Sequence, residues 1–311
     1  AALGWAEDHG QAETGLRLVL AFGVPALQRG MPAEGRDWLR RMQALGGGAS
    51  PLQARALTAL GWFALFQGDS DAAMAAAARA VETAAGESWI LANALNLLGS
   101  VERDRGAPDV ARHWFGEALA LVEDHAEAGV WAPPILMNLG LLAATQGDLV
   151  EARRWYEATL AALPTGAVTF IRPMVLGNLA SIAWDEGDQS RAAILQREAL
   201  PLRRELWDVL ALANSLANAA EHAAVGGQPE VAARLLGAAE ALRLRGRIAI
   251  EPFNLDDRHA LVARVREQLG DPVFAAAWAQ GECLPLDQAI AEADGVLAAA
   301  AQHDSGARTT A

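Results

Sequence analysis

Apolar residues recur at helical spacing along most of this 311-residue chain, and glycine interrupts the pattern at regular intervals. The stretch 138–148, NLGLLAATQGD, shows the unit. Apolar positions run at helical spacing up to Gly147, which can adopt the left-handed conformation that ends a helix. Asp148 then stands where a second helix needs an N-cap. The pattern therefore predicts one helix, a tight turn and another helix.

The same break recurs six times, which indicates a repeat protein. The breaks follow one another at intervals of 38, 38, 41, 40 and 40 residues, and they are Gly30, Gly68, Gly106, Gly147, Gly187 and Gly227. A small residue stands seven positions before each break: Gly23, Gly61, Gly99, Gly140, Ala180 and Ala220. Six copies in register predict an array of helical pairs.

The second helix of each unit has its own pattern. A small residue recurs at Gly35, Ala73, Ala111, Ala152, Ala192 and Ala232. Four positions later most copies have a larger side chain, as at Leu39, Phe115, Tyr156 and Leu236. Small residues at matched places on both helices are expected to let the two backbones approach. Asp69, Asp148 and Asp188 are expected N-caps, and Glu151 gives Asp148 the spacing of a capping box.

These positions resemble the tetratricopeptide repeat over roughly residues 11–245. The units run about 40 residues instead of the usual 34, and the additional residues fall between units. The resemblance implies an all-α fold, a right-handed α-solenoid of about six helical pairs with a C-terminal helical cap. It also implies a binding module that is not an enzyme.

The two ends of the chain depart from the repeat. Residues 1–10 are expected to be the end of a preceding repeat helix, so we expect the chain to be part of a longer protein. The predicted organisation is an array over residues 11–247, capping helices over 248–302 and a disordered tail over 303–311. Within the cap, residues 248–254 are expected to connect to helices at 255–270, 271–281 and 284–302.

Three stretches resemble the C-terminal region of large bacterial regulators of the LuxR/AfsR kind. They are QRGMPAEGRDWLRRMQAL at 28–45, ARLLGAAEALR at 233–243 and LGDPVFAAAWAQGECLPLDQAIAEA at 269–293. In that family a signalling ATPase module and an output domain accompany such repeats. The resemblance implies the sensor region of a transcriptional regulator. Similar arrays accompany kinases and cyclases, so a scaffold or oligomerisation module of such a signalling protein is the alternative.

Composition excludes several classes of function. The net charge of −13 opposes binding to nucleic-acid phosphates. All 25 basic residues are arginine, so no mechanism that requires a lysine is possible. No metal or cofactor motif is present, and we expect no cofactor. The single cysteine, Cys283, cannot form an internal disulfide, and the chain starts without a signal-like segment. We therefore expect a cytoplasmic protein that does not enter a membrane.

Repeat arrays of this kind bind partners on their concave face. Placing the repeat register on this chain predicts a groove lined by Arg55, Trp62, Phe66, Asn93, Asn96, Arg103, Met137, Asn138, Asn178, Trp184, Asn214, Asn218 and Glu221. Asn138, Asn178 and Asn218 stand at one position in three consecutive units. These asparagines either bind the backbone of an extended peptide or form bonds to neighbouring helices and water. The recurring Trp38, Trp114 and Trp155 are interpreted as packing residues.

The only basic concentration lies near the C-terminus and comprises Arg243, Arg245, Arg247, Arg258, Arg264 and Arg266. A solvated face is the simpler interpretation, and contact with an acidic neighbouring domain is the other. Taken together, the sequence predicts a sensor or scaffold. Its ligand in the groove would be a peptide, a partner domain of the same protein or a small effector.

Overall fold

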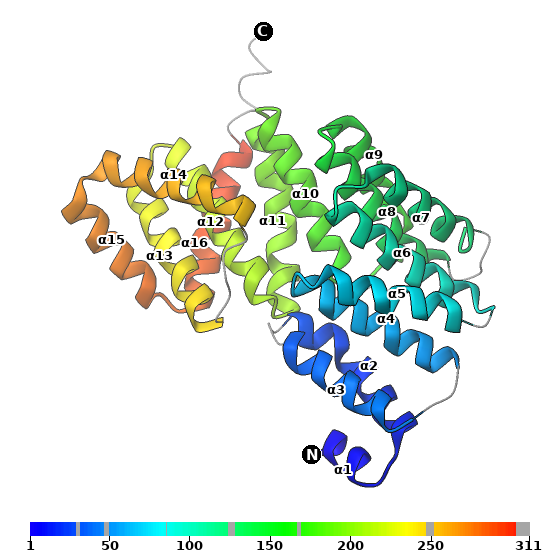
Figure 1. Cartoon of the computed structure of the whole chain (residues 1–311). Helices are drawn as coiled ribbons and strands as arrows, with labels where there is room; N and C mark the ends of the chain where they lie inside the picture. Colours follow the sequence, from blue (N-terminus) through cyan, green and yellow to red (C-terminus); the bar gives the residue numbers. More distant parts are fainter. Residues whose placement is uncertain are drawn as a thin grey trace. The chain divides into compact units, whose positions relative to one another are not determined.

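A computed structural model of the chain describes residues 1–28, 32–46, 50–84, 86–123, 128–166, 169–246 and 252–302. All regular elements in these ranges are α-helices (Figure 1), which confirms the predicted all-α class. Gly30, residues 248–251 of the predicted connector and the predicted tail at 303–311 lie outside the described residues. None of the described helices combines the length and the apolar content needed to cross a bilayer.

The helices follow one another with short connections. They are α1 (Ala2–Asp8), α2 (Ala12–Gln28), α3 (Pro32–Ala44), α4 (Pro51–Phe66), α5 (Ser70–Thr83), α6 (Ser88–Asp104), α7 (Pro108–Ala120), α8 (Ala128–Thr145), α9 (Leu149–Ala162), α10 (Ile171–Asp185), α11 (Gln189–Glu205), α12 (Val209–Val225), α13 (Pro229–Gly246), α14 (Pro252–Leu269), α15 (Asp271–Cys283) and α16 (Leu286–Gln302). Helices α4 with α5, α6 with α7, α8 with α9 and α12 with α13 pack as pairs. The α4–α5 pair also contacts α6–α7, and α6–α7 contacts α8–α9, as an α-solenoid requires.

The turn inside each pair has the predicted chemistry. Gly68, Gly106, Gly147, Gly187 and Gly227 all have positive φ, between 73° and 81°. The carboxylate oxygens of Asp69, Asp148 and Asp188 accept hydrogen bonds from the main-chain N–H three residues on, at 2.8 to 3.1 Å. The capping box at Asp148 forms only in part, because the Glu151 carboxylate instead accepts bonds from Arg112 and Trp155.

In two repeats the glycine of the first helix makes room for a ring of the second helix. A Cβ on Gly99 would lie 2.5 Å from the Phe115 ring, and a Cβ on Gly140 would lie 2.5 Å from the Tyr156 ring. Phe115 and Tyr156 are almost fully buried. The small residue and the aromatic residue therefore form one contact, which is more specific than the close approach of backbones that the sequence suggests.

A second recurring turn lies between the pairs. Gly46, Gly86 and Gly166 follow second helices and have positive φ. Trp207 occupies the equivalent place after α11 with φ of 53°, a conformation in which the side chain of an L-residue is strained. Its side chain is 65% exposed. The sequence pattern concealed this turn because a tryptophan stands where three other copies have glycine.

The chain divides into two compact units. Unit 1 contains the described residues of Ala1–Leu27 and Met31–Ile171, and unit 2 contains those of Arg172–Ala311. Apolar clusters fill each unit, one across α4 to α8 and another across α11 to α16. The partly buried Trp114 and Trp155 pack against the first of these clusters, and Trp38 packs against a cluster nearer the N-terminus. The predicted division into an array and a cap stays a prediction.

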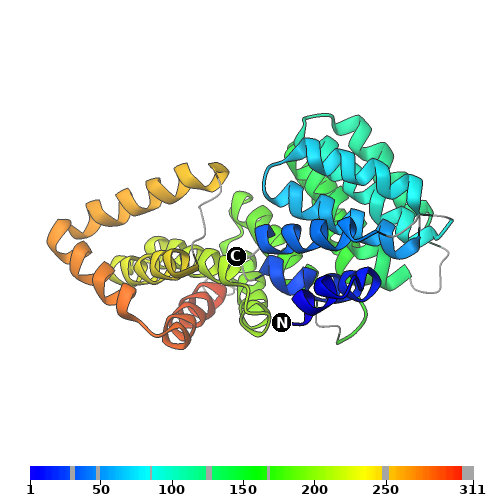
Figure 2. The ribbon, with the colours of Figure 1, turned by 60° about the horizontal axis from the view of Figure 1, so that its bottom comes forward.

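In unit 2 the chain turns back on itself after α14 (Figure 2). Helix α14 begins at Pro252, earlier than the predicted residue 255, since proline is tolerated in a first helical turn. Helix α15 then packs closely on α13. A Cβ on Gly281 would overlap the main-chain oxygen of Arg234, and a Cβ on Gly237 would overlap the main chain of Trp278. Two glycines therefore allow the two backbones to touch.

Helix α16 runs antiparallel along α11. Three polar contacts join them at seven-residue intervals on both helices: Ser190 Oγ to Ala301 O at 2.7 Å, Arg197 to Asp294 at 2.7 Å and Arg204 to Asp287 at 2.9 Å. Apolar side chains of α16, including Ile290 and Leu297, are buried in the same interface. The last helix is thus an integral part of unit 2.

The contact of Gly140 with the Tyr156 ring predicts a stability difference. Gly140→Ala is expected to lower the free energy of unfolding by about 1–3 kcal/mol, because the added methyl group overpacks against Tyr156. Gly116→Ala is the matched control, since no atom lies within 4 Å of the added Cβ on α7. That change is expected to raise stability by up to about 1 kcal/mol. Urea unfolding followed by circular dichroism distinguishes them, and equal effects would contradict the assigned contact.

The junction of α13 and α15 predicts a larger effect. Gly281→Ala is expected to destabilise unit 2 by about 3 kcal/mol, because the methyl group meets main-chain atoms that no rotamer change can move. Gly295→Ala places the same group in open space on α16 and serves as the control. Hydrogen exchange of the α15 amides measures the local opening. Faster exchange in the control than in Gly281→Ala would show that this packing is assigned wrongly.

Candidate binding face of the repeats

The first helices of three consecutive repeats present a shared face. Helix α6 contacts both α4 and α8, and its residues Trp89, Asn93, Asn96 and Arg103 are spaced as neighbours on one side of a helix. We call the side chains that meet here the α4–α6–α8 face. They are Arg55, Trp62 and Phe66 of α4, Trp89, Asn93, Asn96 and Arg103 of α6, and Trp131 and Asn138 of α8.

Aromatic groups form the middle of this face on α4. The Trp62 indole N–H donates to Asn93 Oδ1 at 3.4 Å, so α4 and α6 are joined by a long hydrogen bond. The Phe66 ring lies 6.1 Å from the Trp62 ring and is 63% exposed. The amide nitrogen of Asn93 has no hydrogen-bond partner among the described residues. An apolar surface therefore adjoins an available donor.

The next groups along the face are engaged with each other. Asn138 Nδ2 donates to Asn96 Oδ1 at 2.9 Å, and both side chains are buried. Arg103 approaches Asn138 Oδ1 at 3.5 Å and pairs with Asp104 at 2.8 Å. Met137, also predicted for the groove, is buried. For Asn138 the structure thus agrees with the alternative in which these asparagines bond neighbouring helices.

A stacked row lies at the other end of the face. The Trp89 and Trp131 rings stack 4.5 Å apart, and the exposed Arg55 guanidinium lies 5.2 Å from the Trp89 centroid. The sequence-derived groove contained Arg55 but neither tryptophan. Their signal was available, because Trp89 and Trp131 each precede a predicted asparagine by seven residues, two helical turns.

The other predicted groove residues lie in unit 2. Asn178, Asn214 and Asn218 are half-buried, and none has a hydrogen bond to another described residue. Trp184 packs its ring edge to face against His222, with centroids 4.7 Å apart. Glu221 pairs with Arg264 at 3.7 Å, and burial raises the pKa of its carboxyl group. In the structure Trp184 therefore lies beside the imidazole of His222, and Glu221 lies beside the guanidinium group of Arg264. Neither His222 nor Arg264 was part of the predicted groove.

His222 is the most perturbed titratable group near these residues. Its side chain is 4% exposed, and its Nε2 atom is buried without a hydrogen-bond partner. Burial lowers the pKa of His222 to about 4. The imidazole is therefore neutral at physiological pH and acts as a packing partner of Trp184.

The described residues contain no group of three or more histidine, cysteine, aspartate or glutamate side chains that could hold a metal ion. The absence of a cofactor stays a prediction. What the α4–α6–α8 face offers is aromatic surface, amide groups and the guanidinium group of Arg55.

The buried imidazole predicts acid sensitivity of unit 2. In the unfolded chain histidine takes up a proton near pH 6.5, whereas folded His222 does so near pH 4, so its contribution to stability is lost as pH falls between these values. Between about pH 7.5 and about pH 5.5 the free energy of unfolding is expected to fall by about 1 kcal/mol because of His222. Urea titrations should show this decrease in the free energy of unfolding in the wild type, and the decrease should be absent in His222→Gln.

Glu221→Gln is the control for the neighbouring carboxyl group. Because its pKa is raised, Glu221 contributes stability that is lost as pH rises, the opposite sign. The glutamine variant should therefore show a steeper loss on acidification. An identical pH slope in the wild type and in His222→Gln would contradict the buried neutral histidine.

Comparisons with known proteins agree with the repeat pattern. Two family models described as tetratricopeptide repeat match residues 90–165 and residues 54–86. A search among curated proteins found no match. Residues 90–165 run from the third residue of α6 to beyond α9 and include five of the nine residues of the α4–α6–α8 face.

Solved structures with related arrangements are more distant. They include PilF of Pseudomonas aeruginosa, with 15% identity, a TM-score of 0.43, and coverage of 87% of this chain and 99% of that one. BtubC from P. vanneervenii has 17% identity, a TM-score of 0.47, and coverage of 80% and 90%. TTC0263, a TPR protein of Thermus thermophilus, has 19% identity, a TM-score of 0.42, and coverage of 61% and 96%. We transfer no function from them. The family models show that this chain contains tetratricopeptide repeats, which are modules for interaction between proteins.

Proposed function

We propose that the α4–α6–α8 face binds an extended segment of a protein partner and that the chain acts as a non-enzymatic regulatory module. The observation that carries this proposal is the exposed Phe66 ring and the half-buried Trp62 ring beside the amide nitrogen of Asn93, which has no hydrogen-bond partner among the described residues. Apolar anchors next to a donor are what an extended peptide requires, because its side chains and its carbonyl groups must both be satisfied.

The engaged asparagines have a supporting role in this proposal. The bond between Asn96 and Asn138 fixes α6 against α8, so the exposed groups are held in place before a partner arrives. A fixed surface loses less conformational entropy on binding. Arg55 adds a guanidinium group at one end of the face, which suits a carboxylate of the partner.

Unit 2 supplies a second set of groups for the same kind of contact. Asn178, Trp184, Asn214, Asn218 and Glu221 are half-buried on the first helices α10 and α12. We propose that these residues form a separate contact of unit 2 with a partner segment or with a domain of the same protein. A small effector held at the predicted groove is the remaining possibility.

The biological setting of the module is also a proposal. The resemblance of residues 28–45, 233–243 and 269–293 to LuxR/AfsR-like proteins supports the sensor region of a cytoplasmic bacterial transcriptional regulator. The alternative is a scaffold or oligomerisation module of a kinase or cyclase. The reading frame upstream of Ala1 tests this point. A helix-turn-helix or a P-loop ATPase encoded there would support the regulator, and a kinase or cyclase would support the alternative.

The binding face predicts a specific loss of affinity. Peptides selected from a displayed library against the whole chain should bind Trp62→Ala and Phe66→Ala at least about tenfold more weakly, since each variant removes an apolar anchor. Asn93→Ala should weaken peptide binding about threefold, because it removes one neutral hydrogen bond. Calorimetry on each purified variant measures these changes.

Trp207→Ala is the matched control, because it removes an exposed tryptophan of unit 2 that is not one of the residues of the α4–α6–α8 face. It is expected to leave the affinity unchanged. If the selected peptides bind Trp62→Ala and Phe66→Ala as tightly as the wild type, the proposed face is wrong. Thermal melting of each variant confirms that the fold is intact.

A further inference from the structure

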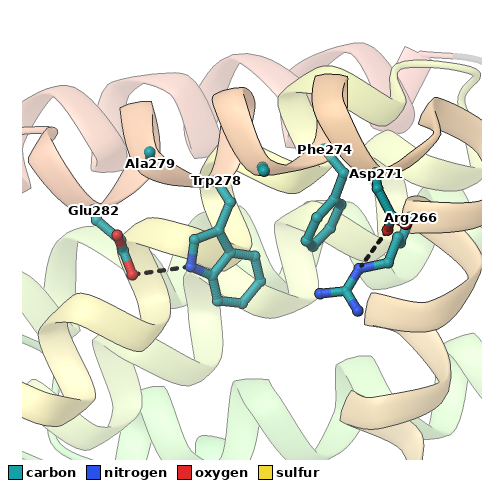
Figure 3. Close-up of a pocket in the computed structure, with 7 residues that line it drawn as sticks. Arg266, Asp271, Phe274, Trp278, Ala279 and Glu282 are labelled. Atoms are coloured by element: carbon teal, nitrogen blue, oxygen red, sulfur yellow. Dashed lines mark hydrogen bonds and ion pairs between the residues drawn. The ribbon is translucent and has the colours of Figure 1, made fainter.

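An open pocket lies beside helices α14 and α15 of unit 2, and none of the residues that line it belongs to the predicted groove (Figure 3). Its volume is about 500 Å³, within the range of small-ligand sites. Arg266 of α14 lines it together with Asp271, Phe274, Trp278 and Glu282 of α15. Figure 3 shows the two rings side by side on α15, with Arg266 next to Phe274 and Glu282 beyond Trp278.

One end of the pocket already binds a cation from the chain itself. The Arg266 guanidinium lies 4.7 Å from the centroid of the Phe274 ring. The same group lies 3.7 Å from the Asp271 carboxylate. An aromatic face and a carboxylate together therefore hold a guanidinium group here, by attraction to the ring and to the opposite charge.

At the other end of the pocket an aromatic ring and a carboxylate again lie side by side, but no cation of the described residues lies with them. The Trp278 indole N–H donates to Glu282 Oε1 at 3.0 Å, which holds the carboxylate beside the ring. Trp278 is half-buried and Glu282 is exposed. Among the described residues, no arginine or histidine lies within ion-pair distance of the Glu282 carboxylate or over the Trp278 ring.

This unpaired carboxylate is unusual within the segment. Residues 271–302 contain five carboxylates and no basic side chain. The other four pair with arginines of other helices: Asp271 with Arg266, Asp287 with Arg204, Glu292 with Arg234 and Asp294 with Arg197. Arg245 approaches Glu282 but donates to its main-chain oxygen at 3.2 Å, which leaves the carboxylate available.

We propose that Trp278 and Glu282 bind an arginine side chain of a basic segment in a protein partner. The guanidinium group would stack on the indole and pair with the carboxylate, as Arg266 does with Phe274 and Asp271. Arginine suits the site better than lysine because its planar group both stacks on a ring and forms two parallel hydrogen bonds. The net charge of −13 favours the approach of a basic partner.

The test uses the full chain and a short acetylated peptide amide, Gly-Arg-Arg-Gly. Binding is followed by calorimetry and by the indole N–H signal of Trp278 in proton–nitrogen NMR spectra, assigned with Trp278→Phe. Glu282→Gln is expected to weaken binding about fivefold, and Trp278→Leu by a similar factor. Arg245→Gln removes a nearby positive charge and is expected to strengthen binding about twofold.

Three controls separate this site from general attraction to an acidic protein. Glu157→Gln makes the same charge change at an exposed position of α9 and should leave the affinity within about twofold. A peptide with citrulline in place of arginine should not bind, and the lysine peptide should bind more weakly. Equal losses in Glu282→Gln and Glu157→Gln, or an unshifted Trp278 signal at saturating arginine peptide, would overturn the proposal.

Discussion

Within the repeats the spacing of helices depends on where a large ring meets a residue without a side chain. Phe115 fits against Gly99 and Tyr156 against Gly140, and the same principle operates between repeats, where the Phe63 ring fits against Gly35. These rings are almost fully buried, so the helices cannot slide without opening a void. The positions of Trp62, Asn93 and Asn138 on neighbouring first helices follow from this packing, and so does the distance at which their side chains meet.

Arginine provides most of the polar links across this framework. Arg36 of one second helix bonds Gln67 and Asp69 at the end of the following first helix, and Arg112 bonds Gln146 and Glu151 at the corresponding place. In unit 2 the buried Arg203 donates to Ser215 Oγ and to the main-chain oxygen of Pro173. The planar guanidinium group can bond two acceptors at once, which explains how a chain without lysine joins successive elements.

Most of the repeat could be predicted from the sequence, but little of the candidate site could. Glycines at helix ends and aspartates at N-caps act through local backbone geometry, so Gly147 and Asp148 could be interpreted without a structure. Asn138 could not, because whether its amide is free depends on Asn96, forty-two positions earlier. The spacing of Trp89 and Trp131 before the predicted asparagines indicated their face, but their stacking and the unpaired carboxylate of Glu282 depend on side chains from other turns or helices. The pairing of α13 with α15 was missed because Gly237 and Gly281 resemble ordinary helix interruptions in the sequence.

The antiparallel contact of α11 with α16 gives unit 2 a different folding character from unit 1. In unit 1 the described helices contact their close neighbours in the chain, so structure can spread from one pair to the next as in a one-dimensional array. Ser190 and Ala301 meet across 111 residues, and Arg197 and Asp294 across 97. Closing such loops raises the contact order, slows folding and ties α11 through α16 into one cooperative transition. The chain thus joins a segment whose helical pairs can open one after another to one in which α11 and α16 are expected to open together.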